Sequence, residues 1–226
     1  MNELRRVLWM AVALFVMQLE AYAASDATPQ SVEALRQQGY TVKNIAPIFG
    51  QLLMTAFPPG FTTVFEKTNG GHYIREAVLQ GETVDKWTEM LTITADKGLA
   101  ANVNLSPQKF AEIKAGGFKN ACPTSFNAKV LGEGKISGYD GFVVVLSCGT
   151  SPASAGETSE STLEVIIKGE SDYYTIQWAK RDEKSATPID IKPAEWTQRF
   201  HLLAPIKLCP IIPGEAAPYP SCIDQK

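Results

Sequence analysis

Histidine is scarce in this sequence of 226 residues, which contains only His72 and His201. A nucleophilic serine or cysteine needs a neighbouring base, and histidine is the usual base near neutral pH. The sequence also lacks the Gly-x-Ser-x-Gly turn of many hydrolases and a glycine-rich phosphate loop between a strand and a helix. We therefore predict that the protein is not an enzyme of these classes, and we interpret both histidines as surface or boundary residues.

Basic clusters are absent as well, and the formal net charge is only −3. Nucleic acids and anionic membranes select basic surfaces, so neither is an expected partner. Beyond residue 23 there is no apolar run long enough to cross a bilayer. We therefore expect no membrane span once the leader described next has been removed.

The first residues have the pattern of a secretory signal peptide. Arg5 and Arg6 precede the apolar run 7–17, and Ala21-Tyr22-Ala23 places small residues where signal peptidase cleaves. The run is too short for a transmembrane helix, and the remaining alternative is a buried N-terminal helix. We predict a signal peptide 1–23, cleavage after Ala23, and a periplasmic or secreted protein. Residues 24–226 show no internal repeat and are expected to form a single domain.

Four cysteines follow the leader, and an even number in an exported chain is typical of disulfides. Three pairings are possible, and we favour Cys122–Cys148 and Cys209–Cys222. The second pair would close the proline-rich segment 210–221 of a C-terminal tail, 204–226. Zinc sites have closely spaced cysteine pairs, which this sequence lacks, so we expect no metal and no other cofactor.

Residue alternation along the chain predicts an α+β fold. In 91–95, Leu91, Ile93 and Ala95 alternate with threonines, which is typical of a half-buried strand. Most neighbouring strands are joined by short turns, so we expect a mostly antiparallel sheet of about six to eight strands with helices packed on it. The predicted helices are 31–38, 106–115 and 193–203, and the predicted strands are 51–56, 61–67, 72–79, 91–95, 126–132, 142–146, 162–168 and 173–180. Segment 149–161 is rich in Gly and Ser and is expected to be a flexible loop.

Asp85 and Glu89 are the paired carboxylates most worth testing. If 83–89 formed a helical turn, residues four apart would share a face and could act as acid and base or bind a cation. The alternative, which we favour, is that Thr83 or Asp85 caps a local turn while Glu89 lies at the edge of a strand. We assign no catalytic residue.

Aromatic residues offer a second kind of candidate site. We expect Trp87 and Trp196 to pack in the core. Tyr173 and Trp178 have opposite parity on one predicted strand, so at least one of them should point away from the core face. An exposed aromatic side chain on a sheet is a candidate contact for a ligand or partner.

Three segments carry a resemblance to a known group of proteins. They are Pro58-Pro59-Gly60-Phe61, the segment GETVDKWTEMLT at 81–92, and the strand YTIQWAKR at 174–181. Together they resemble exported proteobacterial proteins of unknown function, which are similar in element order to the PsbP-like fold of DcrB-like envelope proteins. The resemblance covers about 51–203 and implies a docking or assembly module with no shared catalytic residues.

Three hypotheses about function follow. The first is a non-catalytic binding or assembly module of the bacterial envelope, or a secreted protein, whose partner is another envelope or host protein. The second is a hydrolase or cation-dependent enzyme that uses Asp85 and Glu89. The third is a small-ligand-binding protein with an aromatic-lined pocket. We favour the first, because no complete catalytic constellation is visible.

Overall fold

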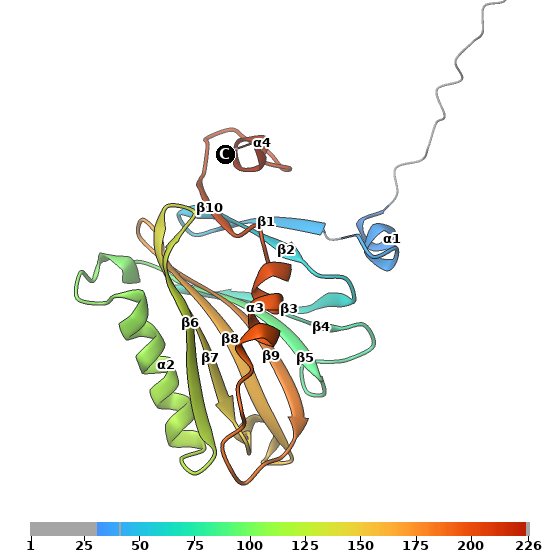
Figure 1. The fold of residues 1–226 in the computed structure, drawn as a ribbon. Coiled ribbons are helices and arrows are strands. Elements are labelled where there is room, and N and C mark those ends of the chain that lie inside the picture. The colour runs from blue at the N-terminus through green and yellow to red at the C-terminus, as the bar shows by residue number, and fades with distance from the viewer. Residues whose placement is uncertain (1–30, 41, 225–226) are drawn as a thin grey trace, which may run out of the picture. The chain divides into compact units, whose positions relative to one another are not determined.

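The computed structural model describes residues 31–40 and 42–224, and the predicted signal peptide lies outside them. Its fold is α+β, as predicted (Figure 1). The helices are α1 (Val32–Gln37), α2 (Pro107–Ala121), α3 (Pro193–Leu202) and α4 (Pro220–Ile223), with 3-10 turns η1 (Leu99–Ala101) and η2 (Pro152–Ser154). The strands are β1 (Val42–Ile48), β2 (Gln51–Phe57), β3 (Phe61–Asn69), β4 (His72–Leu79), β5 (Glu89–Asp96), β6 (Phe126–Ile136), β7 (Tyr139–Cys148), β8 (Thr158–Lys168), β9 (Tyr173–Glu183) and β10 (Lys207–Pro210).

The larger sheet has seven strands in the order β3-β4-β5-β9-β8-β7-β6, and every neighbouring pair is antiparallel. The prediction of a mostly antiparallel sheet of six to eight strands is therefore confirmed. Hairpins join most neighbours, and Gly70, with φ of 59°, occupies the turn between β3 and β4. Glycine adopts this left-handed conformation without steric cost.

A smaller sheet has the order β1-β2-β10. All seven residues of its middle strand, β2, are buried. Strand β10 lies in the C-terminal tail and was not predicted, because it is only four residues long. The carbonyl oxygen of Leu203, just after α3, accepts hydrogen bonds from Thr55 Oγ1 and Ala56 N, both at 2.9 Å. These bonds join the end of α3 to the middle of the smaller sheet.

Asp172, in the turn between β8 and β9, connects three parts of the fold. Its carboxylate accepts hydrogen bonds from Gly50 N at 3.1 Å and from Gly98 N at 2.7 Å. Gly50 lies between β1 and β2, and Gly98 follows β5. Because Asp172 is 2% exposed, these bonds satisfy a carboxylate that burial would otherwise penalise.

The two faces of the seven-stranded sheet are covered differently. The face that carries Leu91, Ile93 and Trp178, called the α3 face here, packs against Trp196 of α3 and Leu53 of β2. The opposite face, called the α2 face, is covered by α2, which packs on β7 and β8 and leaves β4 and β5 less covered. The candidate site lies on this face, where the cover by α2 ends.

Helix α2 is longer than predicted. The sequence prediction ended it near residue 115, before Gly116-Gly117, but it continues to Ala121. Each glycine in a helix costs only about 1 kcal/mol. Phe110 and Phe118 pack against the buried cluster of the α2 face, and the disulfide of Cys122 holds the end of the helix. These tertiary contacts outweigh the weak local propensity and place Phe118 over the sheet.

The segment 149–161 is more ordered than its composition suggests. It contains η2, and β8 begins within it at Thr158. Thr158 pairs with Glu183 and Glu160 pairs with Arg181, so the ladder with β9 extends beyond the predicted strand. The prediction of a flexible loop across the whole segment was wrong, because cross-strand pairing overrode a composition typical of loops.

Candidate functional site

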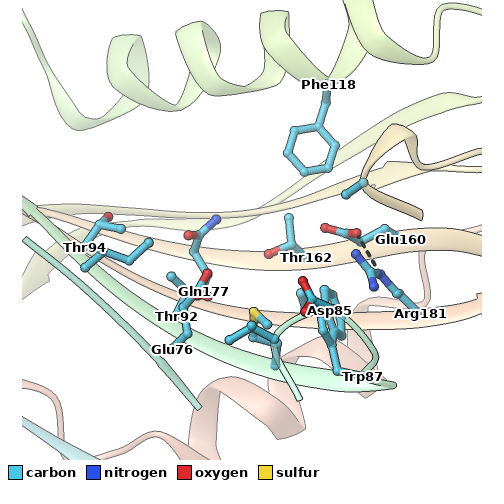
Figure 2. A pocket seen from close by; sticks show the side chains of 15 residues that line it. Glu76, Asp85, Trp87, Thr92, Thr94, Phe118, Glu160, Thr162, Gln177 and Arg181 are labelled. Atoms are coloured by element: carbon cyan, nitrogen blue, oxygen red, sulfur yellow. Dashed lines mark hydrogen bonds and ion pairs between the residues drawn. The ribbon is translucent and has the colours of Figure 1, made fainter. Parts of the chain in front are cut away.

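A cavity of about 430 Å³ lies on the α2 face, between α2, strands β4, β5, β8 and β9, and the segment that precedes β5 (Figure 2). We call it the α2 groove. Its polar and aromatic lining includes Glu76, Asp85, Thr92, Phe118, Gln177 and Arg181. It forms here because α2 packs on β7 and β8 and leaves β4 and β5, on the same face, less covered.

A row of polar residues from four adjacent strands runs along the floor of the groove and continues beneath it to Glu164. Glu76 on β4 pairs with Thr92 on β5, Thr92 pairs with Gln177 on β9, and Gln177 pairs with Glu164 on β8. Gln177 Nε2 donates to Glu164 Oε1 at 2.5 Å. The antiparallel register thus aligns polar side chains that lie far apart in the sequence.

Glu164 is a fully buried carboxylate at the inner end of this row. Lys114 Nζ of α2 lies 2.8 Å from Glu164 Oε2, with the Glu164 side chain 0% exposed. Burial raises the pKa of Glu164, and the ammonium of Lys114 opposes that shift. The ion pair also fixes α2 to the sheet beside the groove.

Several polar side chains that line the groove have no hydrogen-bond partner among the residues that the structure describes. They include the carboxylates of Glu76 and Asp85 and the hydroxyls of Thr92 and Thr94. Thr92 is only 9% exposed, so its hydroxyl has little access to bulk water outside the groove. Partial burial raises the pKa of Glu76 above its ordinary value.

Arg181 and Trp87 close the other end of the groove. The Arg181 guanidinium lies 3.7 Å from the centroid of the Trp87 ring, and its Nε is 3.2 Å from Glu160 Oε2 (Figure 2). The Arg181 amide also donates to Thr88 O at 2.9 Å, which fixes the segment before β5. Trp87 is buried, as predicted, and so is Trp196.

A second, apolar hollow of about 230 Å³ adjoins the groove. The two cavities share Phe118, Ala153 and Glu160, so they lie side by side. Pro152, Ala121 and the disulfide-bonded Cys148 complete the wall of the hollow. The combined site therefore has a polar, acidic end on the strands and an apolar end beneath the last turn of α2.

The structure does not bring Asp85 and Glu89 together. Residues 83–88 are not helical, and Asp85 lines the α2 groove. Glu89 has the parity of Leu91 and points to the α3 face, where its Oε2 accepts from Trp178 Nε1 at 2.6 Å. Arg199 of α3 lies 3.4 Å from Glu89 Oε1. Glu89 therefore joins α3 to the sheet.

Tyr173 and Trp178 lie on opposite faces of β9, as their parity predicts. Both are buried, however, with exposed fractions of 0% and 5%. Tyr173 packs against Phe110 of α2 and donates to Leu105 O, and Trp178 contacts Phe61 edge to face. The expectation that one of them is exposed was wrong, because each face of β9 is covered at that position.

The histidines lie outside the groove lining. His72 Nδ1 is 2.8 Å from Asp96 Oδ1 at an exposed position, and His201 is exposed on α3. Within residues 31–40 and 42–224, no three His, Cys, Asp or Glu side chains are grouped so as to hold a metal ion.

Both favoured disulfides are present, Cys122–Cys148 and Cys209–Cys222. Their Cα–Cα distances of 5.8 and 5.5 Å lie in the usual range for disulfides. Disulfides persist in oxidising compartments, and the pair is consistent with a location outside the cytoplasm. Among the helices of the described residues, none has the length and hydropathy required to span a bilayer.

Sequence reasoning did not single out Glu76, Thr92, Gln177 or Arg181. Their common signal was parity, because polar residues alternate with core residues on the same strands. The sequence does not show which polar strand positions remain uncovered once α2 has packed, so the groove was missed.

Comparisons with known proteins give fold-level matches only. No family model matches the sequence, and no curated protein sequence matches it. Among solved structures, the chain is similar to the Ran-binding protein Mog1p of Saccharomyces cerevisiae, with 13% identity over 72% of this chain and 85% of that chain, and a TM-score of 0.38. It is also similar to LpqN, a protein involved in cell envelope biogenesis of Mycobacterium tuberculosis, with 9% identity over 81% and 99% of the two chains and a TM-score of 0.37. A fold alone does not identify a function, so the function must be argued from the site.

Proposed function

We propose that the protein is a non-catalytic binding module of the bacterial envelope that holds a partner protein in the α2 groove. The observation that carries this proposal is the groove itself, a cavity of about 430 Å³ with acceptors that the described part of the chain leaves unpartnered. Unpaired polar groups near a cavity are costly unless water or a ligand satisfies them. A bound partner would satisfy them.

The chemistry of the groove favours binding over catalysis. Of the described residues that line it, none is histidine, cysteine or lysine. Its carboxylates on Glu76 and Asp85 lie among threonine hydroxyls, but no histidine of the described lining is there to act as their usual base, and Glu89 is held by Trp178 on the other face. The hydrolase hypothesis that pairs Asp85 with Glu89 therefore loses its geometric basis.

The proposed location is the periplasm or the extracellular space, after cleavage following Ala23. The predicted leader and the two disulfides support export. The expected partner is another envelope protein or a host protein, and the predicted resemblance to PsbP-like and DcrB-like envelope proteins agrees with that role.

Site-specific photocrosslinking in the cell that makes the protein tests this function. A photoreactive phenylalanine replaces Ala153, which lines both parts of the site, and the matched control carries it at Val103, which is 86% exposed and lines neither cavity. We expect one protein adduct from position 153, absent from position 103, on a mature chain that begins at Ala24. Adducts from both positions alike, or an uncleaved chain in the cytoplasm, would contradict the proposal.

A small-ligand role is the second candidate, because a volume of about 430 Å³ lies within the range of small-molecule sites. The same experiment separates the two. A small ligand would give no protein adduct at position 153, and native mass spectrometry of the purified protein would instead show a bound mass that is lost on denaturation.

A further inference from the structure

Hydrogen-bond donors are in short supply in the α2 groove. Within the described chain, its free acceptors include the carboxylates of Glu76 and Asp85, the hydroxyls of Thr92 and Thr94, and the amide oxygen of Gln177, whose Nε2 already donates to Glu164. A carboxylate only accepts, so the groove must receive donors from its occupant.

The cation in the described lining of the groove and the one beneath its floor are already engaged. Arg181 is paired with Glu160 and stacked on Trp87. Lys114 is paired with Glu164 below the floor. The remaining charge at the polar end is therefore negative, and an occupant with a positive charge complements it while an anionic occupant meets repulsion.

An aromatic ring adds to this preference. Phe118 projects from α2 toward the strands across the groove (Figure 2). The face of an aromatic ring attracts a cation placed beneath it. The apolar hollow beyond Phe118, walled by Ala121 and Pro152, suits an aliphatic side chain.

From these contacts we infer that the occupant is a basic segment of the partner protein, with a lysine or arginine side chain at Glu76 and Thr92, in the groove that Asp85 also lines, and an apolar side chain in the hollow. This inference rests on the binding role proposed above. It specifies the chemistry of the partner, which that role leaves open.

The length of the site indicates an extended peptide rather than a free amine. Gln177, at the polar end, and Arg181, at the junction with the hollow, are four residues apart on β9. At about 3.3 Å per residue, this separation is about 13 Å. An extended peptide spans it with about four residues, so the basic and apolar side chains should be about four positions apart.

The test uses the purified, disulfide-intact protein and a set of acetylated pentapeptide amides of the form X-Gly-Ser-Gly-Z. X is lysine, arginine, glutamate or serine, and Z is leucine or serine. The readout is the indole N–H signal of Trp87 in nitrogen-15 NMR spectra, assigned with single Trp→Phe variants. Trp178 and Trp196 lie on the α3 face and provide internal controls.

We expect the lysine and arginine peptides with leucine to shift the Trp87 signal and leave the Trp178 and Trp196 signals unchanged. The double variant Glu76→Gln/Asp85→Asn should weaken this binding by about tenfold or more, because both charges that select the ligand are lost. The control Asp190→Asn removes an exposed carboxylate outside the groove and should have no effect. Salt at about 1 M should weaken binding of the basic peptides, since it screens charges beyond about 3 Å.

Three results would overturn the inference. One is a glutamate peptide that binds as tightly as its lysine counterpart, and another is the absence of any Trp87 shift across the set. The third is 1,5-diaminopentane binding as tightly as the best peptide, which would assign the groove to free amines. If position 153 crosslinks a partner whose binding is unchanged in the Glu76→Gln/Asp85→Asn variant, the proposed function stands and this inference fails.

Discussion

The guanidinium of Arg181 lies 3.7 Å from the centroid of the Trp87 ring, although the two residues are far apart in the sequence. Trp87 precedes β5 and Arg181 lies near the end of β9. The Arg181 side chain is 9% exposed and is also paired with Glu160. This stacked cation closes the groove and holds the segment that carries Asp85.

The coupling between Arg181 and Trp87 can be measured by a double-mutant cycle. We expect Arg181→Met and Trp87→Leu to be coupled by about 1–2 kcal/mol in the free energy of unfolding, because a desolvated cation–π contact is stronger than an exposed one. Denaturant unfolding of the two single variants and the double variant checks this. Effects that add within about 0.5 kcal/mol would show that the stack contributes no specific stability.

Removing the carboxylate of Asp85 and removing that of Glu89 should change the free energy of unfolding by very different amounts. Glu89→Ala leaves the Trp178 indole N–H without its acceptor and leaves Arg199 paired with Glu195 alone, so we expect a loss of about 1–3 kcal/mol in stability. Asp85→Ala changes an exposed residue without a partner in the described chain and should alter stability by less than about 0.5 kcal/mol.

The same pair should show the reverse order in binding. Asp85→Ala should weaken binding of the lysine peptide, as measured by the Trp87 indole signal. Glu89→Ala, if folded, should leave the peptide affinity unchanged. Equal effects of both variants on peptide affinity would indicate that the two carboxylates serve one site after all.

The sequence predicted the larger sheet well, because alternation reports directly on strands with one buried face. The hairpin of β3 and β4 and the strands β5, β8 and β9 were all expected. The errors arose where tertiary contacts decided the outcome. Helix α2 continues through Gly116-Gly117 because side-chain packing and a disulfide stabilise it. Strand β10 forms because it pairs with the edge of β2.

The site was much less predictable than the fold. The disulfide pairing followed from compartment and loop composition, and Asp85 was recognised as a candidate. Glu76, Thr92 and Gln177 were not, because a groove depends on where α2 stops covering the sheet. That limit is set by the packing of Phe110 and neighbouring side chains on β7 and β8, which no local pattern encodes.

The two disulfides should differ in their effect on binding. The Cys122→Ser/Cys148→Ser variant should lose about 3 kcal/mol of stability and weaken binding of the lysine–leucine peptide, because Cys148 lines the hollow and Cys122 ends α2. The matched control is Cys209→Ser/Cys222→Ser. It should also be destabilised, but its peptide affinity should be unchanged, because neither cysteine lines the site.

Denaturant unfolding under non-reducing conditions and the Trp87 NMR titration measure the two quantities separately. The titration is performed on the folded fraction, below the unfolding transition of each variant. Equal loss of affinity in both disulfide variants would show that general destabilisation, and not the wall of the hollow, controls binding.

Glu164 should make stability depend on pH in a defined direction. Burial raises its pKa in the folded protein above the unfolded value, so the folded state binds the proton more tightly. The contribution is fully stabilising below the unfolded pKa and is lost as pH rises through the raised folded pKa. The positive charge of Lys114 lowers the pKa of Glu164 and so offsets part of this effect. The pKa remains raised, because desolvation is the largest cause of the shift.

The Glu164→Gln variant isolates this contribution. Glutamine keeps an oxygen that can accept from Gln177 Nε2 but carries no charge to desolvate. The stability of the wild type relative to the variant should therefore fall as pH is raised from about 4 to 8, as measured by denaturant unfolding at each pH. Glu133→Gln, an exposed change on β6, should show no such trend. A difference that stays constant or rises with pH would mean that the ion pair with Lys114 outweighs desolvation and that the pKa of Glu164 is lowered in the folded protein.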